Sequence, residues 1–488
     1  MKVNIKKIGI SIVLMFSFLA TFAYDFEADG LYYRVISTSD FTCAVVNGEI
    51  GNVFTGENLY EGNIVIPSHV EYLNKTLTVT SIDGYAFYKC INLQSVILPE
   101  TLKSIKTSAF EGCGISTIHI PNSVTEIGSS AFKNCRNLES ISLPQDLKIL
   151  SSSLFSNCTS LKTIKIPDTI IGIGSSCFKD CLGLTSIIFP DGLESIGGYA
   201  FENCVNINSI TFPNNLTLIG DYAFSGLNMI TELYLPCSLR EIGSYAFYKC
   251  GELKECTIAA SEEPILFHNV RLKDVCGTFY GCTALSKLVL GRRPQIYDTY
   301  FNRLRAIRTS WIFNESITSI SIMNNVDFWE LISEKCFNES LEDLTLGTYD
   351  FANQFRLYDY SKLKYLTLSS PVPQKCPWFS DNQYMNIILK VPNGTIDTYK
   401  IADGWKNFWN IEEMDISSGI NNINNNKDIS VQVVDGSIEI LNKKEHSAVR
   451  IYTIQGQLIY ETYQSEIQGL PCGLYLITID NNSFKVAI

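Results

Sequence analysis

A five-residue block recurs along this chain at a nearly constant step. It has the form Ala-Phe-x-x-Cys, with occasional changes at the first and last positions. Its phenylalanines, 22 or 23 residues apart until an interruption before the last, are Phe87, Phe110, Phe132, Phe155, Phe178, Phe201, Phe224, Phe247 and Phe279. A fixed period of this length is typical of a solenoid, whose coils bury their apolar side chains only by stacking on one another. The repeat therefore predicts one extended, well-buried core.

A second element lies between successive blocks. Residues 138–144 read Leu-Glu-Ser-Ile-Ser-Leu-Pro, and residues 161–167 repeat the pattern. Alternation of apolar and polar residues predicts a strand buried on one face, which proline ends because it cannot donate the next ladder hydrogen bond. A short segment such as residues 193–197 follows, with two inward apolar residues and a glycine at the turn.

The cysteine of the block recurs at the same place in each coil. The column comprises Cys90, Cys113, Cys135, Cys158, Cys181, Cys204, Cys250 and Cys282. Leu227 takes this position once. Because the position accepts either cysteine or leucine, we interpret it as an apolar packing site whose cysteines are free thiols. Disulfides between adjacent rungs are the alternative, because the expected spacing allows them, although parallel side chains give poor geometry. The phenylalanines should stack as a structural column.

The combined pattern, Leu-x-x-Ile-x-Ile-Pro with Ile-Gly-x-x-Ala-Phe-x-x-Cys, resembles the BspA-type leucine-rich repeat of bacterial surface proteins. The resemblance implies a leucine-rich-repeat solenoid of parallel sheets and short turns. It implies binding of host matrix proteins, other bacteria or glycans. The expected parts are an N-terminal cap over residues 24–81, regular repeats over 82–290, degenerate repeats with an insertion over 291–390, and a C-terminal cap over 391–415.

The composition changes after the cap. Residues 416–428 form an Asn-rich linker, and short strand patterns without the period follow over 429–488, which predicts a small β-sandwich. Residues 451–459, 470–477 and 485–488 resemble the C-terminal sorting domain of type IX secretion cargo. That resemblance implies contact with secretion machinery; an ordinary accessory sandwich is the alternative.

The first residues predict export. Lys2, Lys6 and Lys7 precede the apolar run 8–19, and a signal peptide would be cut after about Ala23. A retained membrane anchor is the alternative, but the run is short for a span. Removing three of the 38 basic residues leaves 35 against 50 acidic ones. We therefore expect a secreted or surface protein that neither inserts in a membrane nor binds nucleic acid.

Groups for catalysis are sparse. Of the four histidines, His119 should be solvated on a strand, and His268 could meet Glu262 and Glu263. Without paired His or Cys spacing, we expect no metal site, no cofactor and no catalytic residue. The least favoured alternative is a glycan-hydrolysing enzyme built on paired carboxylates such as Glu232 and Glu255.

The outward strand positions offer a binding surface for an extracellular protein or glycan. One column comprises Ser95, Thr117, Ser140, Thr163, Ser186, Ser209, Glu232 and Glu255, and a second includes His119, Lys165 and Tyr234. In the insertion, Arg292, Arg293 and Trp311 suggest a basic, aromatic bulge for specificity. A helix over 296–307 covering an irregular coil is the alternative there. A passive structural spacer in a surface layer is the alternative for the whole protein.

Overall fold

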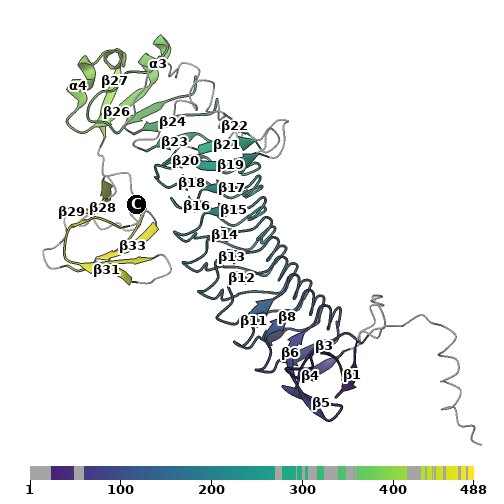
Figure 1. Cartoon of the computed structure of the whole chain (residues 1–488). Coiled ribbons are helices and arrows are strands. Elements are labelled where there is room, and N and C mark those ends of the chain that lie inside the picture. The colour runs from purple at the N-terminus through teal and green to yellow at the C-terminus, as the bar shows by residue number, and fades with distance from the viewer. Residues whose placement is uncertain are drawn as a thin grey trace, which may run out of the picture. The chain divides into compact units, whose positions relative to one another are not determined.

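The structure is a computed structural model of the whole chain (Figure 1). It describes residues 24–48, 60–269, 277–292, 294–298, 303–305, 316–323, 339–347, 357, 360–414, 430–434, 437–441, 443, 447–453, 458–470, 474–479 and 482–487. The chain divides into two compact units, residues 1–144 and 145–488. The expected signal peptide, 1–23, and most of the linker lie outside the described residues.

Unit 1 begins with an antiparallel cap that becomes a parallel ladder. Its main sheet has the order β1-β2-β3-β6-β8-β10, with β5 beside β6. The strands are β1 (Phe26–Ala28), β2 (Leu31–Ser37), β3 (Thr42–Val46), β5 (His69–Tyr72), β6 (Lys75–Ile82), β8 (Ser104–Ile105) and β10 (Glu126–Ile127). Two further pairs are β4 (Gly62–Val65) with β7 (Leu93–Ile97), and β9 (Thr117–His119) with β11 (Ser140–Ser142). Parallel pairing from β3 onward joins the cap to the first coils.

Unit 2 contains two long ladders. The first runs in the order β12 (Ile149–Leu150), β13 (Gly172–Ile173), β14 (Ser195–Ile196), β15 (Leu218–Ile219), β17 (Glu241–Ile242), β19 (Ile265–Asn269), β21 (Pro294–Asp298) and β22 (Arg303–Arg305). The second runs β16 (Glu232–Leu235), β18 (Glu255–Ile258), β20 (Lys287–Leu290), β23 (Ser319–Ile322), β24 (Asp343–Leu346), β25 (Tyr365–Leu368), β26 (Ile388–Pro392) and β27 (Asn410–Met414). Every pair is parallel except β21 with β22.

The strand expected at residues 161–166 does not form a regular ladder. Leu161, Ile164 and Ile166 are buried as the alternation predicts, but no strand is assigned there. The neighbouring coil donates a long hydrogen bond, 3.4 Å from Thr185 N to Lys162 O. The short segments with two inward apolar residues form the continuous ladder instead, at 2.7–2.9 Å for bonds such as Gly174 N to Leu150 O.

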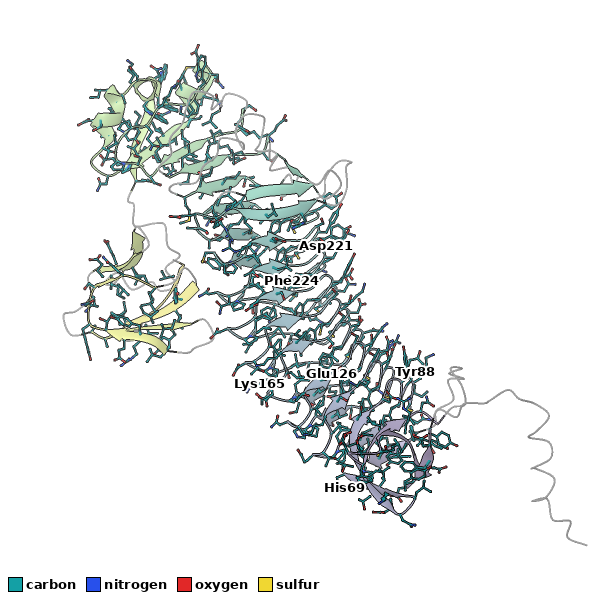
Figure 2. The ribbon with its side chains drawn as sticks, in the orientation of Figure 1. His69, Tyr88, Glu126, Lys165, Asp221 and Phe224 are labelled. Carbon is teal, nitrogen blue, oxygen red and sulfur yellow. The ribbon has the colours of Figure 1, made fainter. Side chains whose placement is uncertain are left out.

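Columns of phenylalanine fill the interior of the coils, as predicted. In unit 1, Phe87 stacks on Phe110 at 5.0 Å between ring centroids. In unit 2, Phe178 stacks on Phe155 at 5.4 Å and on Phe201 at 5.1 Å. Figure 2 shows Phe224 of this column among the side chains inside the coils. Each of these rings is fully buried, so stability is shared between neighbouring coils.

Short helices follow the last coils. These are α3 (Asp381–Asn386), α4 (Ile396–Ile401) and the 3-10 turn η2 (Trp405–Asn407). Ser380 caps α3 through a capping box with Gln383, whose amide also donates to the carbonyls of Leu357 and Tyr360. Trp405 and Phe408, within the C-terminal cap expected over residues 391–415, are buried.

The C-terminal residues form two small antiparallel sheets. One contains β28 (Ser430–Val434), β29 (Ser437–Leu441) and β32 (Glu466–Ile467). The other has the order β31 (Leu458–Thr462), β30 (Val449–Thr453), β33 (Leu474–Ile479) and β34 (Asn482–Ala487). Buried residues from both sheets, among them Ile438, Ile451 and Ile477, form one apolar cluster.

Candidate binding surfaces

The outward strand positions lie on the surface in most coils. Thr117, Ser140, Thr163, Ser186, Ser209 and Glu232 are exposed, as are His119 and Lys165, whereas Ser95, Glu255 and Tyr234 are half-buried. In Figure 2, Lys165 and Asp221 lie at opposite margins of the coils. Within each unit these positions mostly carry small hydroxyl side chains, which would contribute little buried area to an interface.

The paired carboxylates occupy adjacent rungs, as the period predicts. Glu232 of β16 is in register with Glu255 of β18, and Lys287 of β20 follows Glu255. The Lys287 ammonium lies 3.0 Å from a carboxylate oxygen of Glu255. This ion pair offsets the repulsion between Glu232 and Glu255, so the two carboxylates are not an isolated acidic dyad.

The structure corrects the expectation that Arg292 lies on an exposed bulge. Its side chain is 1% exposed, and its guanidinium donates to the carbonyls of Cys237 at 2.8 Å and Pro236 at 2.9 Å. Burial lowers the pKa of Arg292 to about 10. Arg292 therefore holds two carbonyls in the interior and has almost no surface with which to contact a partner.

The helix considered for residues 296–307 is also wrong where the structure describes that segment. Residues of β21 and β22 pair antiparallel there, with Tyr297 opposite Leu304. β21 pairs with β19 and so extends the ladder. Its backbone N–H and C=O groups therefore find hydrogen-bond partners between strands, whereas in a helix they would bond within the segment. Arg293 and Trp311 lie outside the described residues.

His268 meets a different partner from the one expected. Its Nε2 lies 3.2 Å from a carboxylate oxygen of Glu241, on the neighbouring strand of the ladder, rather than meeting Glu262 or Glu263. Within the described ranges, no three His, Cys, Asp or Glu side chains gather in a way that could hold a metal ion.

The predicted column of free thiols is present. All eight of its cysteines are free and buried. Several of these thiols donate to backbone carbonyls; the Cys181 thiol, for example, donates to the carbonyl of Phe155 at 3.2 Å. The side chains of Cys250 and Cys282 are also hydrogen-bonded to each other. Burial raises the pKa of Cys135 and of Cys181 to about 12, so these thiols are protonated and unreactive near neutral pH. Cys237, which lies outside the column, is disulfide-bonded.

Five tyrosines form a surface that the sequence analysis missed. We name it the tyrosine ridge: Tyr199, Tyr222, Tyr245, Tyr248 and Tyr280. Tyr222 stacks on Tyr199 at 5.1 Å and on Tyr245 at 4.9 Å. Tyr248 meets Tyr245 edge-on at 5.6 Å and stacks on Tyr280 at 5.9 Å. The ridge is therefore one continuous run of aromatic contacts on successive coils.

The ridge is accessible and flanked by cations. Tyr199 is 39% exposed and Tyr280 is 45% exposed, and the other three rings are half-buried. The Lys179 ammonium lies 5.4 Å from the centre of the Tyr199 ring, and the Lys249 ammonium lies 5.0 Å from that of Tyr248. Stacking and cation–π contacts hold the rings in place before any partner arrives.

Three ridge tyrosines have an unusual backbone. The φ angles of Tyr199, Tyr222 and Tyr245 are 59°, 54° and 57°, in the left-handed region that bulky residues rarely adopt. Serine fills the same slot in other coils, with similar φ values at Ser153 and Ser176. The sequence signal is the run of Tyr-Ala-Phe in three successive repeats. The four repeats before them have serine in this slot, and the first repeat has Tyr85.

Comparison with known proteins identifies the repeat. The BspA type leucine rich repeat region matches residues 54–184 and 171–303, in six copies. No curated protein matches the chain. In the described part of the chain, no helix is both apolar enough and long enough to cross a membrane.

Several solved structures are similar. A leucine-rich repeat protein from Bacteroides ovatus is 22% identical, with 80% of this chain and 100% of that chain covered and a TM-score of 0.38. A leucine rich cell surface protein from Faecalibacterium prausnitzii is 19% identical, with 66% and 94% covered and a TM-score of 0.35. The pneumococcal vaccine antigen PcpA is 16% identical, with 62% and 93% covered and a TM-score of 0.32.

The family match spans half of the chain and coincides with the coils that contain the phenylalanine and cysteine columns. Proteins built from this repeat are generally binding proteins without catalytic activity. The chain belongs to the BspA type leucine-rich repeat family.

Proposed function

We propose that this protein is an exported adhesion protein that binds an extracellular protein through the tyrosine ridge. The observation that carries the proposal is the stacking of ridge rings on successive coils, at 5.1 and 4.9 Å between Tyr199, Tyr222 and Tyr245. Tyrosine is enriched at protein interfaces because it buries a large area, loses little rotamer freedom and keeps a hydroxyl for hydrogen bonding.

The backbone supports a role for these rings beyond stability. A left-handed φ at a bulky residue costs on the order of 1–3 kcal/mol, and such strain gathers at functional sites. Serine satisfies the same turn in other coils, so the turn itself does not require tyrosine. Binding by the exposed aromatic rings is a benefit that serine would not supply.

The flanking charges favour a protein partner of mixed surface charge. Lys179 and Lys249 border the rings, and Glu202 lies 2.5 Å from the Lys179 ammonium. Rim charges of both signs around an aromatic centre are the usual anatomy of a protein interface. The outward hydroxyl column, with Arg293 and Trp311 of the insertion, is the alternative contact surface to the ridge.

The two ends of the chain fit the same role. The signal peptide would direct export and would be removed by cleavage after about Ala23. The C-terminal sheets would pack as a β-sandwich and act as a sorting domain of the type IX kind, supported by the apolar cluster that the two sheets share. The mature protein would then be secreted or held at the cell surface.

The test is a binding screen of residues 24–488 against arrayed extracellular-matrix proteins. The decisive variant is Tyr199→Ser/Tyr222→Ser/Tyr245→Ser, because serine occupies this turn elsewhere in the chain and the fold should survive. A matched control, Thr163→Ala/Ser186→Ala/Ser209→Ala, alters the same number of coils in the outward column. Circular dichroism and thermal melting check that both variants fold.

We expect saturable binding that falls at least about 30-fold in the tyrosine variant, since one interface hot spot alone contributes about 2 kcal/mol or more. The control should bind within about threefold of the parent. Equal loss in the control would move the site to the hydroxyl column. An absence of saturable binding would favour a structural spacer and refute the proposal.

A further inference from the structure

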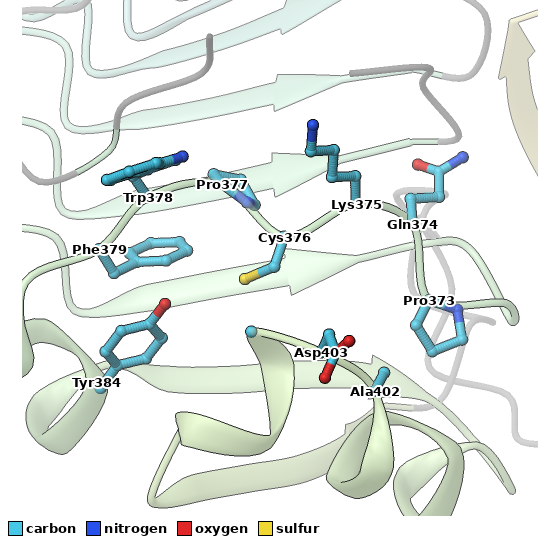
Figure 3. Close-up of a pocket in the computed structure, with 11 residues that line it drawn as sticks. Pro373, Gln374, Lys375, Cys376, Pro377, Trp378, Phe379, Tyr384, Ala402 and Asp403 are labelled. Carbon is cyan, nitrogen blue, oxygen red and sulfur yellow. The ribbon is translucent and has the colours of Figure 1, made fainter. Parts of the chain in front are cut away.

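A pocket lies beside the short helices that follow the last coils. Its volume is about 520 Å³, within the range of small-molecule sites. Residues 373–379 form one wall, and Tyr384 and residues 402–404 complete it (Figure 3). Neither the tyrosine ridge nor the outward columns contribute to it.

The walls of the pocket are held in place by buried contacts. The Trp405 indole donates to the carbonyl of Gln374 at 2.6 Å, which ties the wall segment to η2. Gly404 has a φ of 81°, and a Cβ there would lie 2.5 Å from the Cβ of Cys376, so only glycine allows this approach. Cys376 points toward Tyr384, with which it shares a hydrogen bond (Figure 3). The pocket is therefore formed before any ligand arrives.

The lining combines an exposed aromatic face with ionic groups. Trp378 is 70% exposed, whereas Trp405 nearby is fully buried. Phe379 and Tyr384 lie on the same side of the pocket as Trp378, and Asp403 lies opposite (Figure 3). Gln374 and Lys375 line the remaining edge.

This combination selects the class of ligand. A ring that is apolar on one face and bears hydroxyls at its edge can stack on Trp378 while its hydroxyls accept from Lys375 and donate to Asp403. A purely apolar ligand would remove these ionic groups from water without replacing their hydrogen bonds. Because Asp403 is paired with Lys406, this pair carries no net charge that would select an ionic ligand. A neutral pyranose supplies both the apolar face and the edge hydroxyls.

We propose that this pocket binds a neutral hexopyranose unit of a glycan, stacked on Trp378 and hydrogen-bonded to Asp403. The Asp403 carboxylate lies 2.8 Å from the Lys406 ammonium through one oxygen, and its other oxygen is the acceptor for a sugar hydroxyl. The inference does not rest on the tyrosine ridge, since it assigns a second site with a different ligand.

The test uses residues 24–488 with methyl glycosides of glucose, galactose, mannose and N-acetylglucosamine. Saturation-transfer NMR detects contact, and titration gives the affinity. Trp378→Ala is the principal variant. Trp409→Ala is its matched control, because Trp409 is 74% exposed but does not line the pocket. Asp403→Asn tests the polar half of the site, and thermal melting checks the fold of each variant.

We expect saturable binding of at least one glycoside, at least tenfold weaker in Trp378→Ala, several-fold weaker in Asp403→Asn and unchanged in Trp409→Ala. The ridge variant described above should bind the glycoside normally, so failure of either proposal leaves the other testable. No saturable binding of any glycoside would overturn the inference. Equal weakening by Trp378→Ala and Trp409→Ala would do the same.

Discussion

The buried thiols should make this protein unusually sensitive to alkali. Burial raises the pKa of Cys181 from an ordinary value of 9.0 to about 12. In the unfolded chain the thiol ionises near pH 9, while in the folded chain it stays protonated. The unfolded state therefore binds fewer protons above pH 9, and the free energy of unfolding falls as the pH rises from 9 toward 12.

The magnitude follows from the two pKa values. At pH 10.5 the unfolded Cys181 is almost fully ionised and the folded one is not, which removes about 2 kcal/mol of stability. Burial also raises the pKa of Cys177, Cys204 and Cys250 well above the ordinary value. Several such losses together approach the whole stability of a typical domain, about 5–15 kcal/mol.

The assay compares urea unfolding of the parent and of Cys181→Leu at pH 8.0 and pH 10.5, under argon to prevent oxidation. Leucine occurs naturally at the equivalent position, Leu227, so the fold should accept it. Any packing cost of the substitution is the same at both pH values and cancels. We expect the variant to lose about 2 kcal/mol less than the parent between the two pH values. The same loss in both proteins would refute the reasoning.

Two substitutions, each with a matched control, test the packing of the coils by urea unfolding at neutral pH. Phe178→Ala removes a fully buried ring that stacks on two others and should lower the free energy of unfolding by about 3–5 kcal/mol. Its control, Ile188→Ala, alters a side chain that is 72% exposed and should lower it by less than about 1 kcal/mol. Similar losses for both variants would contradict the buried column. Gly220→Ala places a Cβ 2.4 Å from a backbone nitrogen of the preceding coil and should cost about 1–3 kcal/mol. Gly251→Ala meets nothing within 4 Å and should be nearly neutral, so an equally large loss there would show that close approach is not the cause.

The columns inside the coils could be predicted because they depend only on the period. Once Phe155 and Phe178 occupy equivalent positions one coil apart, stacking is the only arrangement that buries both rings. The hydrogen-bonded ladders could not be assigned in the same way. Residues 161–166 alternate like a strand and bury the expected side chains, but the distance to the next coil decides whether a ladder forms. Two-residue strands such as Ile149–Leu150 are too short to show a period.

The candidate sites were harder to predict, because composition does not determine burial. The charge of Arg292 predicts a surface residue, yet its guanidinium donates to two backbone carbonyls in the interior. The ridge depends on a slot that holds serine in some coils and tyrosine in others, and only coil stacking brings Tyr199 and Tyr222 into contact. The pocket at Trp378 joins segments that share no sequence pattern.

The tyrosine ridge also has a consequence for how such a protein can evolve. Each ridge ring from Tyr199 to Tyr245 belongs to one coil and stands about one coil from the next, at 5.1 and 4.9 Å. Because coils contact mainly their neighbours, duplication of a single repeat would lengthen the ridge by one ring and leave the rest of the fold unchanged. Affinity for a long partner could then rise or fall through the number of copies of one genetic unit, without any new contact having to arise by point mutation.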